Sequence, residues 1–444
     1  MIEEKGLVDL DFSAGKNSVA PETELPKASA RELLNVDLSN SGRLSRRRGY
    51  TKIYDAGSNA VHSLFSSQLH TLFVEGGSLK KLNSDYTATA LGSVDPNSYM
   101  SYAEVNRKTY FTNGVDTGVV LEDGTVAPWG VKEPTGQPLL TLNSSGGLWE
   151  GTYQVAITFV DANGEESGSA LADTIDVPAG YGITCSLFPN SEEASNINIY
   201  LTAPNGTVLH HRAQVPVGTV SVNFLSNPDS YGKQLETQFM ERMPAGQIVR
   251  YFKGRMWVAV GDMLIFSPAL RYGLYDPRHT YFRFPADITI VQPVQDGVYV
   301  VSDQTYFLSG SDPMQMDQRV VYSDGGVAGT GLNVPPTMIK EDQFDELPDY
   351  LAFWYSTNGA VLGLPGGQVQ TITEDRVDIP EFGRGATLLR NQDGIRQLVT
   401  SLSTRGSASG FGASDVATAE IRRNGVLISD FYPVDSWAAG EHCT

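Results

Sequence analysis

Short apolar runs, each closed by a glycine-containing turn, recur along most of this chain. The series begins at Val61 with VHSLFSSQLHTLFVEGGSLKKLN and continues with MSYAEVNRKTYFTNGVDTGVVLEDG. Dipeptides such as Asn113-Gly114 and Asp123-Gly124 supply the positive φ angles that tight hairpins need. The pattern therefore predicts strand–turn–strand units rather than helices.

The same unit returns four more times after a gap. These later units read IVRYFKGRMWVAVGDMLIFSPAL, VQPVQDGVYVVSDQTYFLSGSDP, LAFWYSTNGAVLGLPGGQVQTIT and ATLLRNQDGIRQLVTSL. A unit that cannot bury its own apolar face, repeated at roughly 35–45 residues, is typical of propeller blades. We predict an all-β fold with a β-propeller of about six blades. A stack of hairpins or a flat array would give a similar pattern and stays open as an alternative.

The gap between the second and third units has a different sequence pattern, with longer alternating segments. Tyr153, Val155 and Ile157 alternate with smaller or polar residues, and the same alternation recurs further along the gap. About seven such strands in some 90 residues are typical of a small β-sandwich of the immunoglobulin or fibronectin type. We expect this sandwich to be inserted into the propeller.

These features divide the chain into four parts. We expect an extended N-terminal arm with assembly contacts at 1–55, a first propeller part at 56–133, the inserted sandwich at 134–235, and a second propeller part with a C-terminal tail at 236–444. Two short helices are also expected, at Ala28–Leu34 and at Lys233–Arg242.

The charge balance is strongly acidic, with 32 Lys and Arg against 51 Asp and Glu and a net charge of −19. Sequence-reading DNA proteins need a basic footprint, so this chain is a poor candidate for that class. An acidic channel that lets DNA slide remains compatible with the charge. No apolar run reaches the roughly 18 residues of a membrane span, and the first residues lack the pattern of a signal peptide.

Searches for reactive groups give no site. The chain has six His and two Cys, no GxSxG or SxxK motif, no Walker loop and no HExxH. Adjacent strand residues point to opposite faces, so His210 and His211 are not expected to share a metal ion. DANGEES reads as a hairpin turn rather than a calcium loop, and the acidic run KEDQFDELPDY reads as a solvated loop. We expect no catalytic residue, no cofactor, no metal and no enzyme activity.

Two surface clusters are candidates for interactions. The first is the densest positive patch of the chain, in GRLSRRRGY, and it is a candidate assembly interface: Arg43, Arg46, Arg47 and Arg48. The second is a candidate exposed aromatic surface, in ALRYGLYDPRHTYFRF: Tyr272, Tyr275 and Tyr281.

Three strings together resemble virion structural proteins of tailed bacteriophages. They are LLNVDLSNSGRLSRRRGYTKIY, FKGRMWVAVGDMLIFSPALRYGLYDP and ASDVATAEIRRNG. The nearest in kind is the tail nozzle, or packaged-DNA stabilisation protein, of short-tailed phages. The resemblance covers most of the chain in outline and contains no residue signature of its own.

The resemblance implies a particular role. A propeller protomer would form a homohexamer below the portal and head–tail adaptor rings, with double-stranded DNA passing through it without sequence-specific binding. A tail needle would close the channel, fibres would lie nearby, and the protein would be located in the virion tail after assembly in the host cytoplasm. The family has no catalytic residues. A receptor- or carbohydrate-binding tail or baseplate component is the alternative, and a hydrolase on a propeller scaffold is a third reading.

Overall fold

The computed structural model describes residues 11–33, 36–38, 43–46, 52–336, 349–373, 376, 382–392, 395–404, 417–422 and 425–430. Within these residues the helical elements are short 3₁₀ turns at Glu22–Glu24, Pro313–Gln315 and Pro365–Gly367. Everything else with regular structure is a strand, so the prediction of an all-β chain is confirmed. No helix in the described part of the chain is long and apolar enough to cross a membrane.

Six four-stranded antiparallel sheets, which together we call the body, account for most of the strands. Each of the six sequence units contributes strands to one of these sheets, because its glycine turns let consecutive strands pair as hairpins. The strands of the first three sheets are β5 (Val61–Ser66), β6 (Thr71–Glu75), β7 (Ser78–Leu82), β8 (Ala88–Ser93); β9 (Ser101–Val105), β10 (Lys108–Thr112), β11 (Thr117–Val120), β12 (Val126–Ala127); and β22 (Ile248–Phe252), β23 (Arg255–Val260), β24 (Met263–Phe266), β26 (Tyr281–Arg283). The strands of the last three are β27 (Ile290–Val294), β28 (Gly297–Val301), β29 (Thr305–Ser309), β30 (Asp317–Tyr322); β31 (Leu332–Val334), β32 (Leu351–Ser356), β33 (Gly359–Gly363), β34 (Val369–Thr371); and β35 (Phe382–Gln392), β36 (Ile395–Thr404), β37 (Ala417–Arg422), β38 (Gly425–Asp430).

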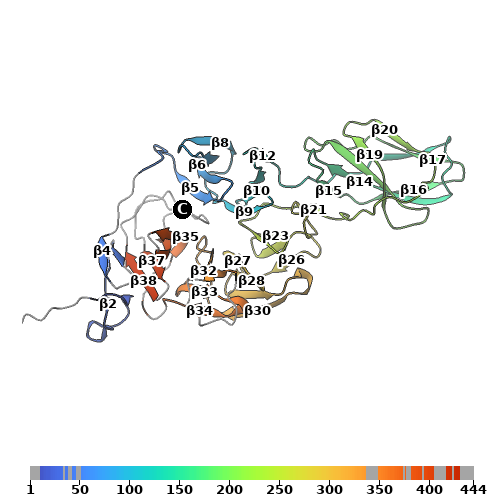
Figure 1. The fold of residues 1–444 in the computed structure, drawn as a ribbon. Helices are drawn as coiled ribbons and strands as arrows, with labels where there is room; N and C mark the ends of the chain where they lie inside the picture. Colours follow the sequence, from blue (N-terminus) through green and yellow to red (C-terminus); the bar gives the residue numbers. More distant parts are fainter. Residues whose placement is uncertain are drawn as a thin grey trace, which may run out of the picture.

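The first strands of successive sheets lie against one another. β9 contacts β22, β22 contacts β27, and β31 contacts β27 and β35. The sheets therefore follow one another around a centre with their first strands innermost, which is a propeller-like arrangement (Figure 1).

Apolar side chains between neighbouring sheets form the cores of the body. One cluster lies between each pair of successive sheets from the first to the sixth. Trp257 and Trp354 are among the largest fully buried side chains in these clusters. Burial of one such side chain stabilises the fold by about 1.5–3 kcal/mol, so these interfaces make the body rigid.

The chain between β12 and β22 forms two sheets that pack face to face, here called the sandwich. Tyr153, Ile157 and Ile183 are nearly inaccessible in the core between the sheets. One sheet has the order β13-β17-β20, and the other joins β14 to β15, β16 and β18, with β19 next to β18. Its strands are β13 (Leu139–Asn143), β14 (Gly151–Val160), β15 (Glu166–Ser169), β16 (Asp173–Val177), β17 (Gly182–Ser186), β18 (Asn196–Leu201), β19 (His210–Pro216) and β20 (Ser221–Phe224).

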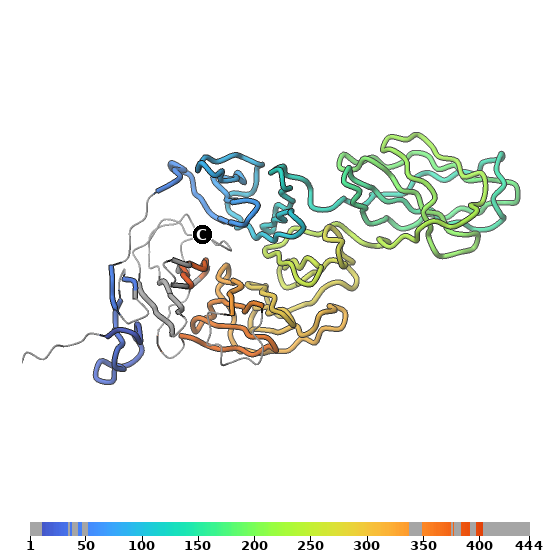
Figure 2. Tube along the Cα trace, in the orientation of Figure 1, coloured from blue at the N-terminus to red at the C-terminus, as the bar shows by residue number. Residues whose placement is uncertain are grey.

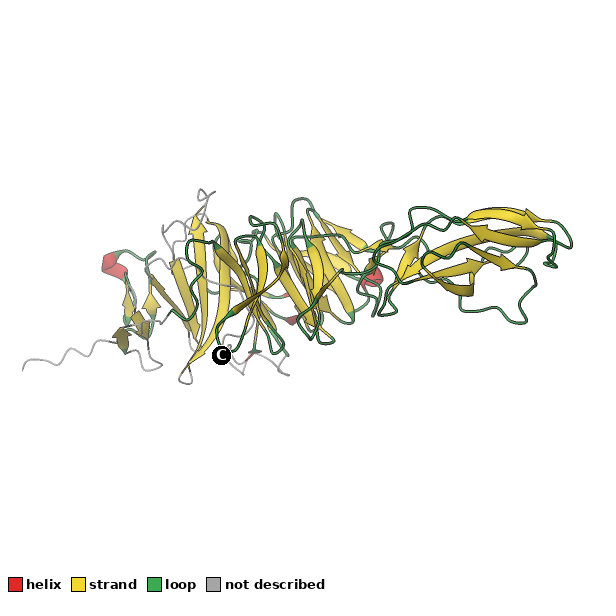
Figure 3. Cartoon of the chain, turned by 90° about the horizontal axis from the view of Figure 1, so that it is seen from above, coloured by secondary structure: helices red, strands yellow, loops and turns green. Residues whose placement is uncertain are grey.

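The sandwich projects from the rim of the body. The tube in Figure 2 shows both connections, before β13 and after β20, leaving the same side of the body. Seen from above, in Figure 3, the sandwich extends the long axis of the molecule and does not cover a face of the body. The 10 residues of β14 span about 33 Å, so the outer end of the sandwich lies far from the sheets of the body.

The N-terminal arm lies beside the sixth sheet. It contains a parallel pair, β1 (Gly15–Lys16) with β2 (Ser29–Ala30), and a hairpin, β3 (Val36–Leu38) with β4 (Leu44–Arg46). β1 and β3 both contact β38. The arm therefore packs against the outer strand of the last sheet.

Both predicted helices are wrong for the residues that the structure describes. Ala28 has a φ of 66° and is followed by β2, while Leu34 lies outside the described residues. In the second segment the Lys233 carbonyl accepts from the backbone N–H of His211 at 2.8 Å, and the Leu235 N–H donates to the Leu209 carbonyl at 2.9 Å. Pairing with the chain around β19 outweighs the helix propensity of these residues.

Candidate functional site at the junction of body and sandwich

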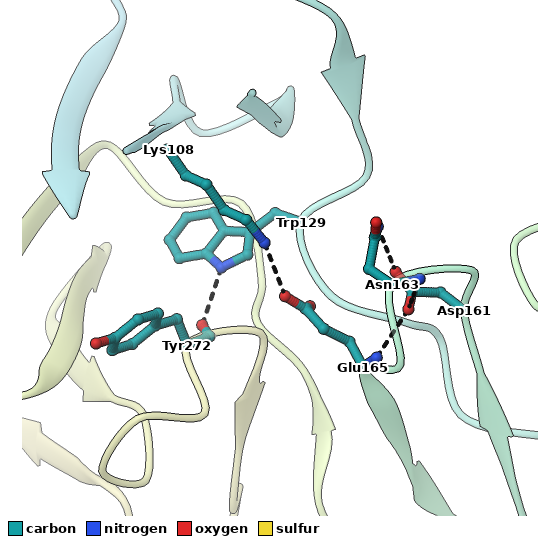
Figure 4. A network of polar contacts seen from close by, with 6 residues as sticks. All are labelled: Lys108, Trp129, Asp161, Asn163, Glu165 and Tyr272. Atoms are coloured by element: carbon teal, nitrogen blue, oxygen red, sulfur yellow. Dashed lines mark hydrogen bonds and ion pairs between the residues drawn. The ribbon is translucent and has the colours of Figure 1, made fainter. Parts of the chain in front are cut away.

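Trp129 is the centre of the junction. Its side chain has 0% exposure, and its indole Nε1 donates to the backbone carbonyl of Tyr272 at 2.9 Å (Figure 4). The Tyr110 ring lies 5.2 Å from the Trp129 ring and 5.9 Å from the Tyr272 ring. Trp129 lies two residues after the end of β12, so this cluster fixes the chain as it leaves the body towards the sandwich.

The next residue needs to be glycine. Gly130 has a φ of 76°, and a Cβ there would lie 2.4 Å from the carbonyl oxygen of Gly273. The same carbonyl accepts from the Met243 N–H at 2.9 Å. The outgoing chain, the returning chain and the third sheet thus meet through backbone contacts at one point.

Arg242 joins the two connections from the other side. It lies in β21 (Glu241–Arg242), which pairs with β25 (Leu274–Tyr275). Its Nε donates to the Trp129 carbonyl at 3.0 Å, its backbone N–H donates to Glu133, and its guanidinium bonds Glu193 of the sandwich at 3.0 Å. One side chain therefore bridges both connections and the sandwich, with the fork of donors that arginine provides.

A hairpin of the sandwich reaches back to the body. Lys108 of β10 forms an ion pair with Glu165 at 3.4 Å, between β14 and β15 (Figure 4). The Asp161 carboxylate holds this turn by accepting from the backbone N–H groups of Asn163 at 2.9 Å and Glu165 at 2.8 Å. The interpretation of DANGEES as a hairpin turn is confirmed, because these oxygens bind backbone N–H groups within a β14–β15 hairpin.

The contacts of this junction serve to position the sandwich. It holds the sandwich at a fixed orientation through buried aromatic packing, close backbone contact and a bridging arginine. Sequence reasoning did not find it, because Trp129 and Tyr272 are 143 residues apart. A tryptophan directly before a glycine, at the border of the inserted segment, was the available signal.

The predicted exposed aromatic surface is wrong for Tyr272 and Tyr275. Tyr272 has 8% exposure and packs at the junction, and Tyr275 is half-buried, with its hydroxyl donating to Glu241 at 3.1 Å. Burial, and then the Glu241 carboxylate, raise the pKa of Tyr275 to about 12. Only Tyr281 of the three is exposed, at 42%. Tyr275 lies in β25 and Tyr272 lies two residues before this strand, and the pairing of β25 with β21 draws this part of the chain inward.

The structure describes two of the four arginines in the predicted basic interface. Arg43 and Arg46 are exposed on the β3–β4 hairpin, while Arg47 and Arg48 lie outside the described residues. The hairpin is tied to the sixth sheet by an ion pair between Asp37 and Arg390 at 3.5 Å.

The other candidate groups stand apart from one another. No group of three or more His, Cys, Asp or Glu in the described ranges could hold a metal ion. His210 and His211 pair with successive residues of β18, so they point to opposite faces. Cys185 is buried in the sandwich core, and burial raises the pKa of its thiol to about 12. Cys443 and the acidic run at 341–346 lie outside the described residues.

A further contact joins the last sheet to the first two. The guanidinium carbon of Arg384, in β35, lies 3.4 Å from the centre of the Tyr99 ring, just before β9. Burial lowers the pKa of Arg384 to about 10, and burial first, with the Arg384 charge contributing, lowers the pKa of His62 in β5. Arg384 and His62 lie in the first strands of the sixth and first sheets, and Tyr99 lies two residues before the first strand of the second sheet.

Comparisons with known proteins identify no family. No family model matches the chain, and no curated protein matches it. Among solved structures, the chain is similar to the crystal structure of BBS1N in complex with ARL6DN, soaked with lead, with 12% sequence identity. The match covers 86% of this chain and 92% of that chain, with a TM-score of 0.27, which is too low to establish a shared fold. The class of protein is therefore defined by its own sheets as an all-β, propeller-like chain.

Proposed function

We propose that this chain is a non-enzymatic structural component of a tailed-phage virion, the tail nozzle. In this role it forms a ring-shaped conduit that retains the packaged genome and passes it at ejection. The observation that carries the proposal from the structure is the rigid junction around Trp129, which fixes a projecting sandwich on a body of six sheets. A conduit needs fixed shape rather than a reactive centre. The three strings of sequence resemblance supply the assignment to phage tails.

The finer description of the fold belongs to the same proposal. The six four-stranded sheets are the blades of a six-bladed β-propeller, and the two-sheet unit between the second and third sheets is an immunoglobulin- or fibronectin-like sandwich. The radial order of first strands supports the first statement, and the shared core of two antiparallel sheets supports the second.

The assembly is what the sequence resemblance implies, and the charges of the chain are compatible with it. Copies of the chain form a homohexamer, and the exposed Arg43 and Arg46 contact carboxylates of a neighbouring copy, since the chain carries 51 acidic residues. The portal or adaptor ring lies above, and needle or fibre proteins lie below or beside the ring. Double-stranded DNA passes without binding, because a net charge of −19 repels phosphates.

Imaging tests this proposal directly. Purified chain is examined by light scattering and negative-stain microscopy, and antibodies against it are used to label purified virions of the phage that encodes it. We expect closed rings and label at the tail. A monomer at high protein concentration together with virions that lack the chain contradicts the proposal.

A receptor- or carbohydrate-binding tail component is the second candidate. The observation that favours it is an uncharged outer face on the sandwich. A glycan site there is compatible with a nozzle and also with a separate receptor-binding role.

A further inference from the structure

One exposed sheet face of the sandwich carries no charge. By strand alternation and register, the face of β13-β17-β20 that points away from the core presents three rows across the sheet. The rows contain Asn143 with Gly182; Thr141, Thr184 and Asn223; and Leu139, Ser186 and Ser221. None of the residues of these three strands is charged, although 19% of the whole chain is. A solvated face normally carries charges, so this face is unusual for the chain.

The polar side chains of this face are already ordered. The Asn143 amide donates to the Thr184 hydroxyl at 3.1 Å, and the Thr184 hydroxyl donates to the Asn223 carbonyl oxygen at 2.6 Å. This chain of hydrogen bonds runs from the outer strand across to β20. It ends on the Asn223 side-chain NH₂, for which the described residues offer no acceptor. The face thus presents fixed donors and acceptors to solvent at little further entropic cost.

An exposed tryptophan lies at the outer end of the same sheet. Trp149 is 59% exposed, whereas Trp129, Trp257 and Trp354 have 0–1% exposure. Its backbone N–H donates to the Asn227 side chain at 3.4 Å, and its carbonyl accepts from the Tyr153 hydroxyl at 2.9 Å. Two hydrogen bonds therefore fix the backbone of Trp149, although its ring gains little stabilisation from burial.

The local geometry turns the Trp149 ring outward. Leu148 is buried in the sandwich core, and its N–H donates to the Tyr181 carbonyl at 3.0 Å, directly before β17. The next side chain along the extended chain points away from the core. Tyr181 and Leu225, which follow the same edge, are 37% and 40% exposed. Trp149, Tyr181 and Leu225 therefore form an exposed apolar rim beside the uncharged face, at the end of the sandwich that is remote from the body.

We propose that this face and its rim bind a neutral polysaccharide. The flat ring of Trp149 stacks on the apolar face of a sugar, and the amides and hydroxyls of Asn143, Thr184 and Asn223 bind sugar hydroxyl groups. The absence of any cation on the three strands speaks against a phosphate or uronic acid polymer, which the net charge would repel. Small polar side chains in place of an apolar centre with a charged rim speak against a protein partner. The inference stands on the sandwich alone and does not depend on the proposed nozzle role.

The first experiment screens the full chain on an array of defined neutral oligosaccharides and of oligosaccharides that contain uronic or sialic acid. The strongest neutral ligand is then titrated by calorimetry. We expect micromolar to millimolar binding to neutral members only, and protection of tryptophan fluorescence from acrylamide quenching on binding. An array without neutral ligands, or a preference for the acidic members, overturns the proposal.

Variants then locate the site. Trp149→Ala is expected to weaken binding at least tenfold, and Asn223→Ala by several-fold, because each removes a group that faces solvent and leaves the core intact. Tyr281→Ala, which removes another exposed aromatic ring from the body, is the matched control and is expected to bind like the parent chain. Equal binding by Trp149→Ala and Tyr281→Ala overturns the assignment. Rings of normal appearance formed by a variant that has lost glycan binding show that this site is separate from assembly.

Discussion

Replacement of Trp129 by Phe tests the rigid junction. The change removes the 2.9 Å hydrogen bond to the Tyr272 carbonyl and trims a side chain with no exposed surface. A buried carbonyl left without its donor costs about 1–3 kcal/mol, and the space left by the smaller ring adds about 1 kcal/mol. We therefore expect the free energy of unfolding to fall by about 2–4 kcal/mol.

Urea unfolding provides the measurement. At an unchanged slope, this loss lowers the midpoint by on the order of 1 M. Trp149→Phe is the control, since it makes the same substitution at a ring that is 59% exposed, and it should stay within about 0.5 kcal/mol of the parent. If the two variants have equal midpoints, the junction does not depend on Trp129 as argued. Small-angle scattering adds a second readout, because a loosened junction broadens the distribution of interatomic distances only in Trp129→Phe.

Three further predictions concern individual groups. The pKa of Tyr275 is raised from 10.0 to about 12, so the neutral phenol stabilises the fold below pH 10 and this contribution is lost as the pH rises through 12. Absorbance at 295 nm should show that Tyr275 titrates at this high pH, and Glu241→Gln should lower its pKa. The Cys185 thiol has no exposed surface, and its pKa is raised to about 12. It should therefore not react with a thiol reagent at pH 8 in the folded chain, and it should react after unfolding in urea. A rapid reaction of the folded chain contradicts the burial of Cys185. Arg384→Gln removes the stack on Tyr99, which is worth about 1–2 kcal/mol, and should lower the unfolding midpoint more than Tyr99→Phe, which keeps the ring.

Turn chemistry made the strands of the body predictable. Asn113-Gly114 and Lys253-Gly254 lie at turns with positive φ, and the apolar runs on either side of such turns became paired strands. This worked because a hairpin is specified by residues close together in the sequence. The same reasoning identified the longer strands of the sandwich from their alternation.

Contacts between distant segments could not be read in this way. KQLETQFMER has good helix formers, but Leu235 is 5% exposed and Thr237 is 0% exposed, because the segment lies along the sandwich. Tyr272 looked like part of an aromatic loop and is instead covered by Tyr110 and Trp129. In both cases tertiary pairing decided the structure, and no local pattern encodes the partner.

The way the body closes has a physical consequence. Every successive pair of sheets from the first to the sixth shares an apolar cluster, but among the described side chains no such cluster joins the sixth sheet to the first. All four strands of the sixth sheet also come from the last part of the chain, and none of the described N-terminal strands is built into it. Closure in the described region thus rests on the Arg384–Tyr99 stack and on the N-terminal arm beside β38. One stacked pair and the arm stabilise the contact between the sixth and first sheets less than a buried apolar cluster would. Backbone hydrogen exchange of the body should therefore be fastest at this contact, and contacts from a neighbouring copy would stabilise it most.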